Sequence, residues 1–289
     1  MAAKVFLDYD QEALDRAFDQ QAWASNGAET LEHYKTLGEQ ARASLPCRLN
    51  LQYGAGPDEF LDLFPAGPAP APVHIHIHGG GWRLQRKEDA SHAAPAITQA
   101  GMHYVAPDFS ALPGRRLPEV VDQSARAVAW IHQHAQALNI DPDRIFISGH
   151  SSGGHVCAVL LTLDWSKYGL PPDVIKGGLC ISGMYDMEPV LLSARRSYVE
   201  LDPQEARALS PVATHAAISC PVSIAYAQND SPEFIRQARQ FADALTGARL
   251  PCELIQVPNT NHYEIIGRLA SLAQTCRAFE AGFANAARP

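Results

Sequence analysis

The sequence predicts an α/β fold with a mostly parallel central sheet and helices on both of its faces. The first observation is rhythm: from residue 73 onward, short apolar runs alternate with longer amphipathic segments. Parallel strands joined by crossover helices produce this alternation. The second observation is size, because 289 residues with 46% hydrophobic and 19% charged side chains can bury the core that such a fold needs.

The N-terminal segment differs from the rest, because residues 8–45 carry two helical patterns and no strand pattern. Leu14, Ala17 and Phe18 mark the apolar face of the first helix. We therefore expect an N-terminal helical arm over residues 1–45, a candidate lid, joined to an α/β domain over residues 46–289. No internal repeat is visible, so both parts are expected to form one domain overall.

The predicted sheet begins with a hairpin. Residues 47–53 alternate, with Leu49 and Leu51 on a half-buried face, and residues 59–64 alternate again after a turn. A proline-rich spacer over residues 65–72 cannot continue either strand. The remaining strands are predicted over Val73–Ile77, Met102–Ala106, Arg144–Ser148, Gly178–Ser182, Val222–Ala227 and Glu253–Val257, with amphipathic helices over Glu119–Leu138 and Pro232–Leu245.

Composition limits the partners. A formal net charge of −8 argues against nucleic acid or anionic membrane, and no apolar stretch approaches the ~18 residues of a membrane span. Six scattered cysteines without a CxxC pair, and a start without a signal-peptide core, predict reduced thiols in a cytoplasmic protein. Nothing in the sequence calls for a cofactor, the expected partner is a small-molecule substrate, and homodimerisation is left open.

A nucleophile is predicted where a strand meets a helix. The strand Arg144–Ser148 runs into Gly149-His150-Ser151-Ser152-Gly153, and a helical pattern follows. In this context a Gly-x-Ser-x-Gly match places the serine on a sharp turn above the sheet. Ser151 is therefore the candidate nucleophile. An ordinary helix cap is the alternative, because serine also caps helices well.

A glycine run follows an earlier strand, in His78-Gly79-Gly80-Gly81-Trp82. Without side chains, its N–H groups can approach a substrate oxygen and form an oxyanion hole together with the N–H of Ser152. Gly80 and Gly81 are the favoured donors, and Gly79 is an alternative.

The acid and the base of a triad should follow later strands, in the chain order Ser, Asp, His that is typical of the α/β-hydrolase fold. Asp230 ends the strand Val222–Ala227 and is the candidate acid. Asp186 follows the strand before and is the rival, and either can instead cap a helix. His262 follows the last strand and is the candidate base.

Three alternating histidines, His74, His76 and His78, offer a different chemistry. Histidines spaced in this way on a strand can bind a metal. No second cluster of His, Asp or Glu with ligand spacing is present to complete the coordination. We therefore expect no metal, with His78 bracing the glycine loop and the other two hydrogen-bonded in the core.

Several runs beyond the catalytic motifs resemble the kynurenine formamidase (arylformamidase) family, and the resemblance spans roughly residues 60–270. The matching runs are residues 78–82, 149–155, Ile181–Pro189, Leu209–Pro211 and Asp230–Phe234. The resemblance implies an α/β-hydrolase fold and Ser151, Asp230 and His262 as the triad. It also implies hydrolysis of N-formyl-L-kynurenine to kynurenine and formate without a metal.

Trp82, His150 and Tyr185 are the predicted substrate contacts, with Tyr198 as a further aromatic wall; each has a structural interpretation as well. Gly81 also brings the glycine motif close to that of hormone-sensitive-lipase-like esterases, so a carboxylesterase acting on short-chain aryl esters is the main alternative. A metal-dependent amidohydrolase and a non-catalytic ligand receptor are weaker ones. A receptor would be expected to lose a triad member, whereas all three are present.

Overall fold

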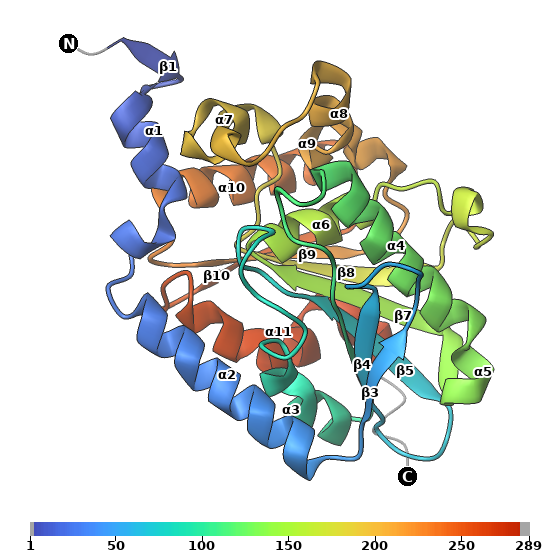
Figure 1. Ribbon diagram of the computed structural model, residues 1–289. Coiled ribbons are helices and arrows are strands. Elements are labelled where there is room, and N and C mark those ends of the chain that lie inside the picture. The colour runs from blue at the N-terminus through green and yellow to red at the C-terminus, as the bar shows by residue number, and fades with distance from the viewer. Residues whose placement is uncertain (1–2, 284–289) are drawn as a thin grey trace.

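The computed structural model, which describes residues 3–283, is built around an eight-stranded sheet (Figure 1). Its strand order is β10-β9-β8-β7-β5-β6-β4-β3. The strands from β5 to β10 run parallel, and β3 and β4 join as an antiparallel hairpin beside β6. The strands are β3 Arg48–Gln52, β4 Phe60–Phe64, β5 Ala71–Ile77, β6 His103–Pro107, β7 Ile140–His150, β8 Ile175–Ile181, β9 Val222–Ala227 and β10 Cys252–Val257.

Helices cover both faces of the sheet, as the sequence predicted (Figure 1). One core lies under α4 Leu117–Gln133, α6 Ser152–Leu160 and α10 Pro232–Gly247. A second core lies under α3 Ala94–Gln99 and α11 Leu269–Thr275 on the other face. Because the central strands are buried on both faces, they consist of nearly continuous apolar residues. The other helices are α5 Ala135–Leu138, α7 Met187–Leu192, α8 Pro203–Ala208, α9 Pro211–Thr214 and α12 Glu280–Phe283.

The N-terminal arm contains α1 Gln11–Phe18 and α2 Gly27–Ser44, as its helical patterns indicated. Its apolar face is buried, and Phe18 packs edge-on against Phe234 of α10 with 5.9 Å between ring centroids. One expectation for the arm was wrong: β2 Tyr9–Asp10 lies within residues 8–45, where no strand pattern was found, and it pairs with β1 Lys4–Phe6 as a short hairpin. Two such short strands are below the length at which alternation is visible in a sequence.

The hairpin of β3 and β4 differs from the expected alternation in one detail. Its pairing shifts register between Arg48 and Leu51, and Asn50 has a left-handed φ of 55°. The N–H of Asn50 turns inward to donate to Asp62 (2.8 Å). The bulge separates the two leucines that were expected on one half-buried face, so Leu49 is exposed.

No helix within residues 3–283 is both long enough and apolar enough to cross a membrane.

Candidate active site

Ser151 lies between the end of β7 and the start of α6, on a turn that only glycine neighbours permit. Its φ of 56° and ψ of −120° are strained for a residue with a side chain. A Cβ on Gly149 would lie 2.0 Å from the carbonyl oxygen of Gly153, and a Cβ on Gly153 would lie 2.1 Å from that of Ile77. The two glycines of the motif are therefore required by backbone packing.

Ser151, His262 and Asp230 form one hydrogen-bonded chain. The Ser151 Oγ lies 2.9 Å from His262 Nε2, and His262 Nδ1 lies 2.7 Å from Asp230 Oδ1. A carboxylate only accepts hydrogen bonds, so Nδ1 carries the proton and Nε2 offers its lone pair to the serine hydroxyl. All three residues are buried, with between 2% and 6% of their surface exposed.

Asp230 is held at the end of β9 by its second carboxylate oxygen. Oδ2 accepts from the hydroxyl of Ser182 (2.6 Å) and from the N–H of Ala227 (2.8 Å). The rival Asp186 lies elsewhere, where it caps α7 by accepting from the N–H of Glu188 (3.1 Å). The structure thus brings Asp230, and not Asp186, to the histidine.

The glycine loop after β5 lies beside the serine. Gly80 and Gly81 both have a positive φ, 90° and 65°, and line one pocket together with Ser151 and His262. The N–H of Trp82 donates to Ser152 Oγ (3.1 Å) and ties the loop to the nucleophile turn. Within residues 3–283, no hydrogen bond to protein is donated by the N–H of Gly80, Gly81 or Ser152, so these donors remain available to a ligand.

Comparisons with known proteins identify the family of the chain. Residues 119–284 match the prolyl oligopeptidase family, more than half of the chain, and residues 61–168 match the BD-FAE family. The chain is 30% identical to a kynurenine formamidase from Salmo salar, covering 91% of this chain and 92% of that protein. It is 32% identical to a kynurenine formamidase from Danio rerio, covering 81% of each.

The chain belongs to the α/β hydrolases, in their kynurenine formamidase and esterase branch. It is a serine hydrolase by fold and family. Among solved structures, it is similar to a candidate thioesterase from Silicibacter sp. TM1040, with a TM-score of 0.79 and 28% identity, covering 89% of this chain and 94% of that one.

His150 supports the base of this hydrolase. Its Nε2 donates to the carbonyl oxygen of His262 (2.8 Å), and the two rings lie 4.8 Å apart. Burial, followed by the nearby His262, holds the pKa of His150 well below its ordinary value, so the ring is neutral. The ring also borders the pocket that contains Ser151, and its predicted contact with substrate stays a prediction.

Two of the predicted substrate contacts are wrong. Trp82 and Tyr185 have none of their surface exposed, and neither lines the pocket of Ser151. Trp82 packs edge-on against His155, and Tyr185 stacks on Phe241. Both lie next to motif residues in sequence, but the turns that expose the motif direct these large rings into the core. Tyr198 does line the pocket.

The histidines of β5 are engaged with protein groups. His74 Nε2 and His76 Nδ1 both contact the hydroxyl of Ser148, at 2.6 and 2.7 Å. Burial lowers the pKa of His74 to about 3. His78 Nε2 lies 3.2 Å from Asp108, and its Nδ1 lies 3.1 Å from the carbonyl of the next residue in the glycine loop. Residues 3–283 contain no group of three His, Cys, Asp or Glu placed to hold a metal ion.

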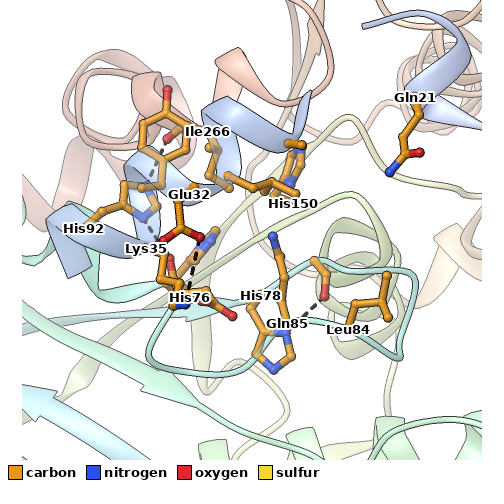
Figure 2. A pocket seen from close by; sticks show the side chains of 16 residues that line it. Gln21, Glu32, Lys35, His76, His78, Leu84, Gln85, His92, His150 and Ile266 are labelled. Atoms are coloured by element: carbon orange, nitrogen blue, oxygen red, sulfur yellow. Dashed lines mark hydrogen bonds and ion pairs between the residues drawn. The ribbon is translucent and has the colours of Figure 1, made fainter. Parts of the chain in front are cut away.

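Two adjoining pockets lie at this edge of the sheet. The outer pocket, about 240 Å³, contains Ser151 and His262. The inner pocket, about 270 Å³, is shown in Figure 2, where His76, His78, His92 and His150 lie around it. Both are bordered by His150, Leu84 and Gln85, and by Gln21 and Leu31 from the N-terminal arm.

Part of the wall of the outer pocket was missed by sequence reasoning. Phe18 and Asp19 reach it from the arm, and Arg195 and Tyr198 from the segment between β8 and β9. Tyr198 was considered as an aromatic wall, but Arg195 was not considered at all. The sequence signal for this wall was the amphipathic pattern of the arm, because the apolar face of a helix has to be buried against another part of the protein.

Proposed function

We propose that this enzyme hydrolyses an aryl formamide, N-formyl-L-kynurenine or a similar compound, through an acyl-enzyme on Ser151. The observation that carries the proposal is the hydrogen-bonded chain from Ser151 through His262 to Asp230, next to N–H groups of the glycine loop that find no acceptor within residues 3–283. The two kynurenine formamidases that the chain resembles support the formamide as the substrate.

In the first half of the reaction, His262 Nε2 takes the proton of Ser151 as the hydroxyl oxygen attacks the formyl carbon. The N–H groups of Gly80, Gly81 and Ser152 stabilise the negative charge that develops on the carbonyl oxygen. The C–N bond then breaks, and His262 gives its proton to the departing arylamine. Asp230 holds the imidazole in the required tautomer and stabilises its positive charge.

In the second half, water replaces the amine. His262 takes a proton from the water as its oxygen attacks the formyl ester of Ser151. The tetrahedral intermediate collapses, the serine oxygen recovers a proton from His262, and formic acid leaves and loses its proton to water as formate. The products are an arylamine, formate and one proton released to solvent, and the protons transferred at the serine, the amine and the attacking water all pass through one imidazole nitrogen. No oxidant or metal is required by this sequence of steps.

A carboxylesterase that acts on short-chain aryl esters is the second candidate. The observation that favours it is the inner pocket of about 270 Å³, which is far larger than the hydrogen atom that completes a formyl group. A longer acyl chain could enter that space. The same residues and steps apply, with an alcohol or phenol in place of the arylamine.

The deciding experiment compares kcat/KM for N-formyl-L-kynurenine with kcat/KM for p-nitrophenyl acetate, and uses the Ser151→Ala variant as the blank. We expect the formamide to be preferred even though its leaving group is intrinsically poorer. Preference for the ester by orders of magnitude would reject the formamide in favour of the carboxylesterase. Turnover of both substrates by the Ser151→Ala variant would reject the proposed mechanism altogether.

A further inference from the structure

Arg195 lies close to the reacting centre of the outer pocket. It belongs to the short helix Ala194–Ser197 between β8 and β9, and it lines the pocket together with Ser151 and His262. Its Nη1 lies 3.5 Å from the position that a Cβ on Gly81 would occupy. The guanidinium is therefore beside the glycine loop, within reach of a substrate bound at the serine.

The hydrogen bonds of Arg195 go to neutral oxygens. Nη1 donates to the hydroxyl of Tyr198 (3.2 Å) and Nη2 to the carbonyl of Phe18 (2.9 Å). Within the described residues its Nε is buried without a partner. A guanidinium has five N–H donors and a permanent positive charge. The two neutral oxygens leave donors unused. The guanidinium lies over the rings of Phe18 and Trp82, 5.7 and 6.0 Å from their centroids, but within the described residues no carboxylate pairs with its charge.

Other half-buried arginines of this chain are paired differently. Each contacts a carboxylate: Arg42 with Asp62, Arg126 with Glu59, Arg144 with Asp141 and Arg236 with Glu233. Of the half-buried arginines within residues 3–283, Arg195 is the one without an acidic partner. A charge removed from water is costly unless it is paired, so this position favours the binding of an anion that the described residues do not supply.

The other charged groups at the outer pocket leave it positive. Arg83 stacks over the ring of Tyr198, 4.4 Å from its centroid, and also lines the pocket. Asp19 is the acidic residue of this lining, but it is exposed and accepts from the N–H of Gln21 (3.1 Å) at the start of a short helix. The lining of the outer pocket thus contains two guanidinium groups and one carboxylate, and the carboxylate is exposed to solvent.

From this arrangement we infer that Arg195 binds a carboxylate of the substrate. The substrate class is then an acylated arylamine that carries a carboxylate on its side chain. A planar guanidinium recognises such a group with two parallel hydrogen bonds. The inference rests on the proposed function for the choice of acyl group. Arg195 acts here in specificity, because the bond that breaks lies elsewhere in the substrate.

The test uses two substrates that differ by the carboxylate alone, N-formyl-L-kynurenine and its decarboxylated analogue N-formylkynuramine. The Arg195→Gln variant should lose about 10- to 100-fold in kcat/KM on the first, mostly through KM, and less than about threefold on the second. Arg196→Gln is the matched control, because Arg196 is exposed in the same helix and does not line the pocket. Equal losses on both substrates, or no loss on either, would overturn the inference.

A second measurement separates this inference from the proposed function. L-Kynurenine and kynuramine are compared as competitive inhibitors of p-nitrophenyl acetate hydrolysis, which requires no formamidase activity. Kynurenine should bind more tightly to the wild type, and Arg195→Gln should remove the difference. If formamides are not hydrolysed but kynurenine still binds more tightly than kynuramine, the proposed formamide substrate is wrong and the inferred carboxylate binding by Arg195 is supported. If the two inhibitors bind equally well to the wild type, the carboxylate is wrong.

A purely structural role for Arg195 would show differently. Because Nη2 also anchors Phe18 of the arm, Arg195→Gln can lower stability, which thermal unfolding of both arginine variants will report. Arg195→Lys keeps the charge but loses the planar fork, so it should recover part of the discrimination between the two substrates. A lysine variant with wild-type stability and no discrimination at all would contradict carboxylate binding through charge.

Discussion

The two sides of the outer pocket are built in different ways. The catalytic side consists of turns at the carboxyl ends of buried parallel strands, where a Cβ on Gly149 or Gly153 would overlap backbone atoms. The opposite wall consists of the N-terminal arm and the segment between β8 and β9. That wall is held by the packing of the arm's apolar face, as in the contact of Phe18 with Phe234, and by long-range hydrogen bonds such as that from Ser231 to the carbonyl of Ala17 (2.6 Å).

This difference separates chemistry from selectivity. A change on the catalytic side should affect every substrate equally, because each one needs the same proton transfers and the same oxyanion donors. A change in the wall should affect substrates according to the groups that touch it. The predictions below test this division, beginning with the largest expected effect.

Asp230→Asn should lower kcat by about 10⁴-fold on both formamide and ester substrates, because an asparagine in this place no longer fixes the tautomer of His262. Asp186→Asn is the control from the preceding strand end, and it should stay within about twofold of wild type in kcat. Steady-state kinetics of the two variants on both substrates make the comparison. A large loss in the Asp186 variant, with Asp230→Asn active, would exchange the two assignments.

Gly80→Ala should lower kcat by about 100- to 1000-fold on both substrates. Alanine is strained at a φ of 90°, and its Cβ would lie 2.5 Å from the backbone nitrogen of Gln85, so the loop and its N–H donors must shift. Gly67→Ala is the control, because a Cβ there meets nothing within 4 Å. If Gly80→Ala retained wild-type kcat while folded, the oxyanion donors would have to lie elsewhere.

Leu84→Ala tests the rim of the pockets. Leu84 is 80% exposed and borders both pockets, so its loss should raise KM for aryl substrates about 3- to 10-fold through lost apolar contact, with kcat and thermal stability unchanged. Leu254→Ala, at a 40% exposed position on β10, is the control. A fall in kcat that is equal for all substrates would show that Leu84 supports the catalytic residues and does not act through contact with the substrate.

The smallest expected effect concerns stability in acid. Burial lowers the pKa of His155 in α6 to about 4, so the unfolded chain binds a proton there before the folded one does. This contribution to the free energy of unfolding is complete above pH 6.5 and is lost as the pH falls toward 4. We expect urea unfolding to show that, between pH 7.5 and pH 5.5, the free energy of unfolding falls by about 1 kcal/mol less in His155→Gln than in the wild type. His134→Gln, at an exposed position, should lose as much as wild type.

The sequence allowed good predictions where local geometry alone decides. The parallel strands and both helix-covered faces follow from hydrophobic rhythm, and the turn at Ser151 follows from glycines that tolerate no Cβ. The strand that carries the acid followed from chain order, although Asp186 had to be separated from Asp230 by structure. Local patterns were therefore sufficient to predict the strands and the turns that carry the catalytic residues.

Most side chains of the pocket wall could not be predicted, because no local pattern specifies which of them face the site. Trp82 and Tyr185 stand beside the motifs in sequence, yet their rings point into the core. Arg195 stands in a polar run without periodicity, and the inferred role follows from the fact that no carboxylate within residues 3–283 pairs with it. The arm brings Phe18 across more than a hundred residues of sequence to the nucleophile, which no spacing rule anticipates.

The most direct test of Ser151 as the nucleophile is covalent labelling with a fluorophosphonate, followed by intact-mass and peptide analysis. We expect one phosphonyl group per chain, located on Ser151, with complete loss of turnover and no labelling of Ser151→Ala. A wild-type enzyme that stays unlabelled and active, together with turnover that persists in Ser151→Ala and is abolished by chelation, would contradict the serine mechanism.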